Sequence, residues 1–141
     1  MSRILIAVAT FYEDIAEELV LGAQSRLDVA KHQVDVVKVP GAFELPAAIR
    51  YAMYGADAYD GYIALGCVIR GETTHYDVVC NEAARGLQDI ACDAPLGFGL
   101  LTVENKEQAM KRASVNQGNV GRKAADACLQ MIALRERFTA E

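Results

Sequence analysis

The sequence predicts a three-layer α/β fold with a four-stranded parallel sheet. Four short runs, three apolar and one rich in β-branched residues, recur along the 141 residues, and each is followed by a segment with the spacing of an amphipathic helix. Runs that are apolar at every position are typical of strands buried on both faces, and strands that alternate with helices pair in parallel. The predicted strands cover residues 4–8, 34–39, 62–69 and 97–103.

The predicted helices follow these strands, and several of their ends carry local signals. Pro46 lies in the first turn of the second helix, where proline is tolerated, and Gly55 lies at its end, where glycine is common. Asn105 and Gln108 are spaced as a cap for the fourth helix. The helices cover approximately residues 13–31, 43–54, 75–90, 105–112 and 122–137.

Length and composition predict a single domain over residues 1–141 and exclude several classes of protein. The formal net charge of −5 argues against a nucleic-acid partner, so any phosphate must be bound locally. No apolar run approaches the roughly 20 residues that span a bilayer, and the N-terminal run lacks the flanks of an export signal, so we expect no membrane partner and a cytoplasmic location. The four cysteines lack Cys-x-x-Cys spacing and the chain has two histidines, so we expect free thiols and no metal site.

The segment that leads from the third strand into the third helix carries the most informative pattern. Thr74, with Asp77 three positions later, is typical of a helix N-cap. Unpaired backbone N–H groups are therefore expected near Glu72 and Thr73, where they can bind an anion. His75 lies in the first helical turn, where the helix dipole favours a neutral imidazole that can accept and return protons.

Three loops follow strands of the predicted sheet and should meet at its carboxyl edge, the edge at which parallel sheets bind ligands. Together they would offer an aromatic ring, a carboxylate, an anion site and an imidazole, which suits a planar polar ligand next to a phosphate. The loops comprise residues 10–12, 40–44 and 70–75.

Each of these features also has a purely structural interpretation. Phe11 can be a core ring that closes the first turn. Gly41 can serve a positive-φ turn, and Glu44 can be an acidic residue favoured at a helix N-terminus. His75 can be a solvated surface residue, and Arg112 can interact with the C-terminal dipole of its helix. On residue physics alone, the sequence indicates an α/β domain that binds a phosphate ester.

Four blocks of the sequence indicate a more specific function. In order and spacing they resemble the lumazine synthase family over nearly the whole chain. The blocks are VPGAFELPAAIR (39–50), ALGCVIRGETTHYDVVCNE (64–82), FGLLTVENKEQAMKRA (98–113) and QGNVG (117–121). The resemblance implies a flavodoxin-like fold and a step of riboflavin biosynthesis. In that step 5-amino-6-(D-ribitylamino)uracil and 3,4-dihydroxy-2-butanone 4-phosphate give 6,7-dimethyl-8-ribityllumazine, phosphate and water, and no cofactor is required.

The resemblance also implies roles for individual residues. His75 would be the catalytic proton donor and acceptor. The phosphate would lie on Glu72 and Thr73 at the helix N-terminus, with Arg112 as its charge-assisted partner. Phe11 and Phe98 would contact the pyrimidine ring. Substrate-binding groups, largely of the backbone, would further come from Ala42, Phe43, Glu44, Cys67, Val68 and Ile69.

Two of these residues are not expected in the site of their own subunit. Phe98 lies at the start of the fourth strand, well over about 10 Å from the carboxyl edge at about 3.3 Å per residue. Arg112 ends a helix that should run back along the sheet to the same remote edge. We therefore expect a site shared between neighbouring subunits, in agreement with the pentameric rings of the family.

The sequence departs from the family pattern in two places. Asn116 and Val120 occupy positions that are commonly lysine in relatives, so Arg112 is expected to carry more of the phosphate binding. The chain begins almost directly at its first strand, whereas many relatives have a leading extended segment that pairs with a neighbour. A pentamer is therefore expected, and assembly into a larger shell is not implied.

Three other functions are compatible with the same fold. The main alternative is a non-catalytic carrier of flavin or lumazine, and another is a riboflavin synthase that acts on two lumazines. Neither needs a phosphate site, so the presence of Glu72, Thr73, His75 and Arg112 argues against both. A structural shell protein is the third, and it does not exclude catalysis.

Overall fold

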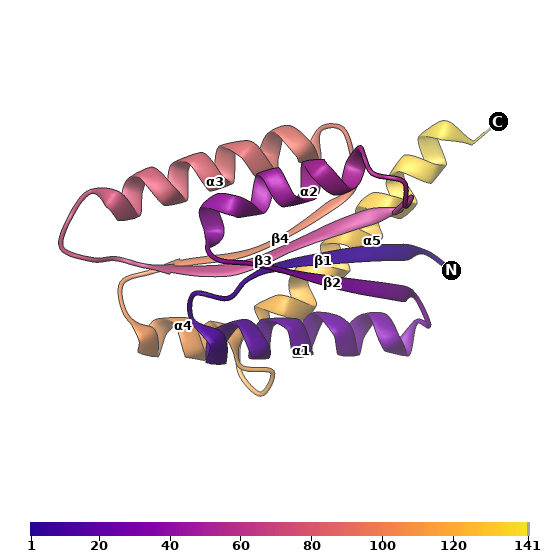
Figure 1. Ribbon diagram of the computed structural model, residues 1–141. Helices are drawn as coiled ribbons and strands as arrows, with labels where there is room; N and C mark the ends of the chain where they lie inside the picture. The colour runs from indigo at the N-terminus through magenta and orange to yellow at the C-terminus, as the bar shows by residue number, and fades with distance from the viewer. Residues whose placement is uncertain (141) are drawn as a thin grey trace.

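Four parallel strands form one sheet in the computed structural model, which describes residues 1–140 (Figure 1). The strands lie in the order β2-β1-β3-β4, so the predicted α/β class with its parallel sheet is confirmed. The strands are β1 (Arg3–Ala9), β2 (Gln33–Val39), β3 (Gly61–Ile69) and β4 (Leu96–Val103). The helices are α1 (Glu13–Val29), α2 (Leu45–Met53), α3 (His75–Ala91), α4 (Lys106–Ala113) and α5 (Val120–Thr139), and a short 3-10 turn, η1 (Ala42–Glu44), precedes α2.

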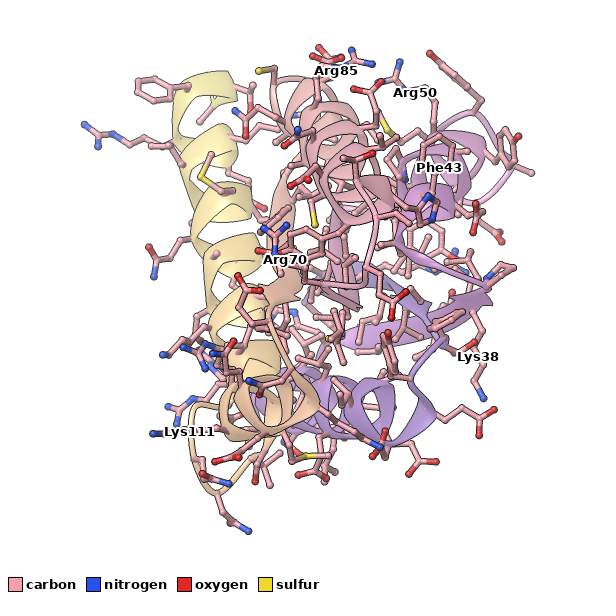
Figure 2. All side chains as sticks on the ribbon, turned by 90° about the vertical axis from the view of Figure 1, so that its left-hand side faces the viewer. Lys38, Phe43, Arg50, Arg70, Arg85 and Lys111 are labelled. Carbon is pink, nitrogen blue, oxygen red and sulfur yellow. The ribbon has the colours of Figure 1, made fainter. Side chains whose placement is uncertain are left out.

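Helices cover both faces of the sheet: α2 and α3 lie on one face, and α1, α4 and α5 lie on the other (Figure 1). The alternation of side chains along β1 supplies both cores, because Ile4 and Ile6 pack with α1 and α5 while Leu5 and Ala7 pack with α2 and α3. Figure 2 views the molecule from the carboxyl ends of the strands, where the loops of interest lie. Among residues 1–140, no helix combines the length and the apolar character needed to cross a membrane.

The expectation that every strand is buried on both faces is wrong for β2. This strand lies at one edge of the sheet, and Val36 and Val37 are 38% and 39% exposed. The other edge strand, β4, is mostly buried but exposes Phe98 and Thr102. The run that identified β2 contains Asp35 and Lys38, so it is not continuously apolar, and a strand of this kind fits an exposed edge.

The helix ends agree with the predictions to within a few residues, and one cap is confirmed in detail. The Asn105 side chain accepts a hydrogen bond from the Gln108 N–H at 2.8 Å, and the Gln108 side chain accepts one from the Glu104 N–H at 2.8 Å. The first helix ends before Lys31, whose left-handed backbone (φ 60°) cannot continue it. Residues 42–44, predicted as the start of the second helix, form the 3-10 turn η1 instead.

Candidate functional site

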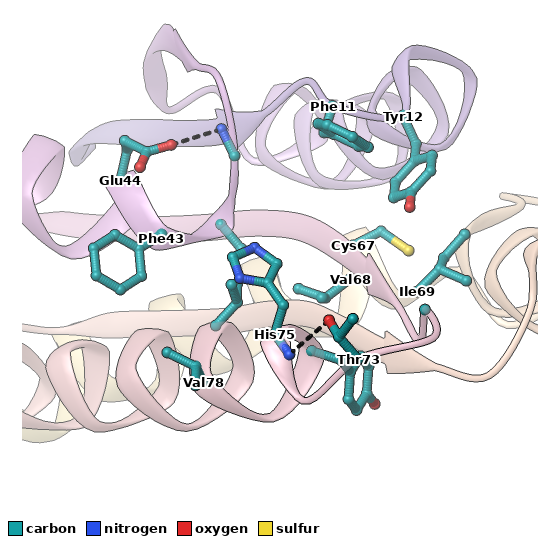
Figure 3. Close-up of a pocket in the computed structure, with 15 residues that line it drawn as sticks. Phe11, Tyr12, Phe43, Glu44, Cys67, Val68, Ile69, Thr73, His75 and Val78 are labelled. Carbon is teal, nitrogen blue, oxygen red and sulfur yellow. Dashed lines mark hydrogen bonds between the residues drawn. The ribbon is translucent and has the colours of Figure 1, made fainter.

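A cavity of about 600 Å³ lies at the carboxyl edge of the sheet, a volume in the range of small-molecule sites (Figure 3). Its wall comes from the three loops that the sequence predicted to converge, and from the first turns of α3. The residues that line it are Phe11, Tyr12, Gly41, Ala42, Phe43, Glu44, Cys67, Val68, Ile69, Gly71, Thr73, His75, Tyr76, Val78 and Val79.

The loop after β1 contributes two neighbouring aromatic rings. Phe11 is 73% exposed, so its interpretation as a core ring is wrong, and an exposed ring at a cavity can stack on a planar ligand. Tyr12 packs edge to face against it with ring centroids 4.9 Å apart, and partial burial raises the pKa of its phenol. Tyr12 was not among the predicted site residues, although its place beside Phe11 in the same loop was the available signal.

The loop after β2 holds a carboxylate in a defined orientation. The Gly41 N–H donates a hydrogen bond to Glu44 Oε1 at 3.0 Å, which fixes the side chain at the entrance to η1 (Figure 3). Gly41 has an extended backbone with φ −149°, so the positive-φ interpretation of this glycine is wrong. Glu44 thus acts in the local turn and also lines the cavity.

The start of α3 differs from the prediction in its cap. Thr74 has a helical backbone and makes no side-chain cap; instead Thr73 Oγ1 accepts a hydrogen bond from the His75 N–H at 3.2 Å. Asp77 does not reach back to the cap, because its carboxylate lies 3.7 Å from Nη1 of Arg70. In the described chain, residues 1–140, the backbone N–H groups of residues 71–74 donate no hydrogen bond. The expected row of free donors is present, and it can bind an anion at the positive end of the helix.

The His75 side chain points from this turn toward the loop that carries Phe43 and Glu44 (Figure 3). The residue is exposed in the single chain and also lines the cavity, so the solvent-exposed and the functional interpretations both remain compatible with its position. Glu72 is exposed too, but its side chain does not contribute to the cavity wall.

The end of β3 supplies Cys67, Val68 and Ile69 to the wall of the cavity. Cys67 is only 8% exposed, and burial raises the pKa of its thiol to about 12. Burial raises the pKa of Cys128, in the core, to about 12 as well. Both thiols are therefore almost fully protonated at neutral pH.

Thiol labelling should reflect this difference in burial. At pH 8 a disulfide reagent is expected to modify Cys92 rapidly, because this thiol is exposed, while a pKa of about 12 leaves only about 10⁻⁴ of Cys67 and Cys128 as thiolate. Cys80 is half-buried with a raised pKa and should react slowly. The absorbance of the released reagent should show one rapidly reacting thiol per chain in the native protein and four in denaturant. The rapid reaction should be absent from Cys92→Ser. A second fast thiol in the native protein would contradict the burial.

Known proteins are similar to this chain over nearly its whole length. The family model for 6,7-dimethyl-8-ribityllumazine synthase matches residues 1–136. The chain is 52% identical to 6,7-dimethyl-8-ribityllumazine synthase 1 of Rhizobium meliloti (strain 1021), a comparison that covers 99% of this chain and 95% of the relative. It is 50% identical to the synthase of Bartonella tribocorum, over 96% of this chain and 91% of the relative, and 47% identical to that of Novosphingobium aromaticivorans, over 99% and 100%. The chain belongs to the 6,7-dimethyl-8-ribityllumazine synthase family.

Phe98 lies outside the cavity of its own chain. The resemblance to the lumazine synthase family implied that this residue contacts the pyrimidine ring. Phe98 pairs with Ala64 in the sheet, five residues before Ile69 at the carboxyl end of β3, or about 16 Å along the strand. Its ring is 47% exposed on the edge strand. The predicted distance between Phe98 and the carboxyl edge is confirmed.

Arg112 also lies outside the cavity, but its predicted place at the amino edge of the sheet is wrong. The helix α4 has only eight residues and therefore spans about 12 Å, less than half the length of β4. Its start is tied to α1 by the ion pair between Lys106 and Asp14 at 2.8 Å, and the Val115 N–H after its end donates to Glu18. Lys111, next to Arg112, lies in the layer across the sheet from Phe43 (Figure 2).

The Arg112 guanidinium donates a hydrogen bond to the Gln108 carbonyl at 3.0 Å, as the helix-end interpretation predicts. Among residues 1–140 of this synthase-family chain, no group of three or more His, Cys, Asp or Glu side chains is arranged to hold a metal ion.

Proposed function

We propose that this chain is a 6,7-dimethyl-8-ribityllumazine synthase that condenses 5-amino-6-(D-ribitylamino)uracil with 3,4-dihydroxy-2-butanone 4-phosphate. One observation carries the proposal: a single cavity brings an exposed aromatic ring, an oriented carboxylate and an imidazole next to unpaired N–H groups at a helix N-terminus. Membership of the family supports the same reaction.

The groups in the cavity suit the two substrates separately. The ring of Phe11 would stack on the pyrimidine, while Glu44 and the backbone at residues 42–44 and 67–69 would bind its polar edge and the ribityl chain. The phosphate would lie on the N–H groups near Thr73, where the α3 dipole favours negative charge. The two substrates would thus be held by different segments of the chain, and good mutual orientation is worth up to roughly 7–11 kcal/mol.

His75 would act in the proton transfers of the reaction. The aromatic amine attacks the ketone, and loss of water gives an imine; elimination of phosphate follows, and the ribityl-bearing nitrogen then closes the ring with loss of a second water. Most of these steps move a proton, and an imidazole at the start of α3 can accept it and return it. No cofactor is needed for this sequence.

We further propose that the active site is shared between subunits of a homopentamer. Apolar side chains at the cavity, Phe11, Phe43 and Val78, are more than half exposed in the single chain, and Phe98 is exposed on the edge strand. Exposed apolar surface of this kind is typical of an interface. Arg112 and Phe98 do not line their own cavity, which supports a role in the neighbouring one. A cytoplasmic location is part of this proposal and fits the free thiols.

Mixed assemblies test the shared site. Arg112→Ala should mainly weaken binding of the phosphate substrate, and His75→Ala should mainly slow turnover. When both variants are unfolded and refolded together in equal amounts, about a quarter of the sites would combine an intact His75 with an intact Arg112 from the neighbour. At a concentration of the phosphate substrate well below its KM, where both separate variants are nearly inactive, activity should then rise to about a quarter of that of the unchanged protein. Activity no higher than the mean of the two separate variants would refute the shared site.

Turnover of the purified protein with both substrates tests the proposed reaction itself. Lumazine absorbance and released phosphate should increase in equal amounts. Tight binding of lumazine or flavin without phosphate release would instead support a carrier of the same fold, and the role proposed for Arg112 would be withdrawn. Native mass measured in parallel reports the pentamer.

A further inference from the structure

The side chain of Arg70, at the end of β3, joins three segments around the candidate phosphate site. Its Nε lies 2.9 Å from Glu104 Oε2 in the loop between β4 and α4, and its Nη1 lies 3.7 Å from Asp77 Oδ1 in the first turn of α3. The guanidinium also lies over the ring of Tyr76, 4.3 Å from its centroid. Figure 2 shows Arg70 near the centre of the carboxyl edge.

The loop that Arg70 begins has few contacts of its own. The residues from Gly71 to Thr74 are exposed, their N–H groups donate no hydrogen bond within residues 1–140, and nothing lies within 4 Å of the position of a Cβ at Gly71. Such a loop is positioned mainly by its two ends. Arg70 fixes one end through its N–H, which donates to the Val103 carbonyl at 2.9 Å, and its side chain reaches the other end at Tyr76 and Asp77.

The loop between β4 and α4, which carries Glu104, holds the Arg70 side chain in a fixed position. The Glu104 N–H donates to the Gln108 side chain at 2.8 Å, so the carboxylate that holds Arg70 comes from a backbone that is itself fixed by the α4 cap. Arg70 therefore ties the free N–H groups to the sheet and to a capped helix. It also neutralises Asp77 and Glu104, two carboxylates that would otherwise repel an incoming phosphate.

We propose that Arg70 is a positioning residue, which holds the loop 71–74 and the first turn of α3 in the geometry that binds the phosphate substrate and aims His75. This inference rests on the proposed function. Arg70 acts through its neighbours, because both of its ion-pair partners are carboxylates of the chain and its planar group is stacked on Tyr76. The arrangement requires arginine, since lysine has neither the planar fork that reaches two carboxylates nor the flat face that stacks on a ring.

The variant Arg70→Lys tests this role while keeping the positive charge. The KM for the phosphate substrate should rise about tenfold and kcat should fall by about the same factor, because the N–H groups and His75 lose their common alignment. The KM for the pyrimidine substrate should stay within about twofold, since Phe11 and Glu44 lie on other loops. The melting temperature should change by less than about 4 °C, because both ion pairs are partly exposed.

Arg85→Lys is the matched control. Arg85 also lies near two carboxylates, Glu82 at 2.9 Å and Asp89 at 3.9 Å, but it lies farther along α3 and outside the cavity. Its replacement should leave all three kinetic constants unchanged. Glu104→Gln should resemble Arg70→Lys, and the double variant should be no worse than the poorer single variant, because both changes release the same loop.

The outcomes separate the positioning role from the reaction itself. If the unchanged protein turns over and Arg70→Lys behaves like Arg85→Lys, the proposed function stands and the positioning role is overturned. An equal rise in both KM values with a large drop in melting temperature would overturn it as well, because that pattern indicates general destabilisation. Inhibition by inorganic phosphate gives an independent reading: its inhibition constant should rise about tenfold in Arg70→Lys and stay constant in Arg85→Lys. Without turnover in the unchanged protein, both proposals fail.

Discussion

Replacing His75 with alanine is expected to lower kcat by about 10²-fold or more, since a positioned general acid–base typically contributes 10²–10⁴-fold. The enzyme should not be inactive, because the cavity that orients the two substrates remains. The KM for the pyrimidine substrate should change little, as Phe11 and Glu44 come from other loops. Steady-state measurement of lumazine formation at saturating concentrations of both substrates gives the comparison.

The chain offers a matched control, because its other histidine is remote from the cavity. His32 lies just before β2, at the amino edge of the sheet, where its Nδ1 accepts a hydrogen bond from the Ser2 N–H at 3.0 Å. His32→Ala should therefore keep full kcat. Added imidazole should restore part of the rate of His75→Ala if a missing proton carrier is the defect. A His75→Ala enzyme as active as the His32→Ala enzyme would remove His75 from the mechanism.

The fold could be predicted from the sequence because local pattern and burial agree in the central strands. In β1 every position from Ile4 to Ala9 is buried, so its apolar run correctly predicted a strand that helices cover on both faces. In β2 the run is interrupted by Asp35 and Lys38, as expected of a strand at the edge of the sheet, and several of its residues are exposed. Burial was thus predictable for the centre of the sheet, and the two charged residues in β2 were the sequence signal that its edge is exposed.

The candidate site was predictable where topology alone brings residues together. Parallel strands end at one edge, so the loops that carry Phe11, Glu44 and His75 had to converge. The details that depend on side-chain choice were not predictable: Thr73 rather than Thr74 caps α3, and Asp77 pairs with Arg70 at the end of the preceding strand. Arg70 is also bound by Glu104, which follows β4, and a contact between segments this far apart in the sequence leaves no local pattern.

Arg112 shows a second kind of error, which concerns length. The ends of α4, the helix that carries Arg112, were predicted correctly to within a residue or two. The distance that this helix spans along the sheet was overestimated. Eight helical residues advance about 12 Å, whereas the eight residues of β4 advance about 26 Å. A helix must therefore be about twice as long as its strand to return to the opposite edge. Whether Arg112 reaches a neighbouring cavity is decided by the mixed assemblies proposed above.

Replacing Gly97 with alanine is expected to lower the free energy of unfolding by about 3 kcal/mol, because a Cβ there would overlap the carbonyl oxygen of Ala124 in α5. A helix backbone cannot rotate away as a side chain can, so α5 would have to move off β4, where Cys128 is buried between them. Thermal unfolding followed by circular dichroism, at fixed protein concentration, should show a melting temperature lower by about 10 °C.

Gly71→Ala is the control that shows whether the loss of stability in Gly97→Ala comes from the close contact between β4 and α5. Nothing lies within 4 Å of a Cβ at Gly71, and its φ is not in the left-handed region, so alanine fits the native backbone without strain. Its free energy of unfolding should stay constant or rise by up to about 1 kcal/mol, since alanine restricts the unfolded chain more than glycine does. Because β4 also carries Phe98 toward the proposed neighbouring site, Gly97→Ala should weaken assembly and activity together. Equal melting temperatures for the two variants would show that α5 does not pack on β4 this closely.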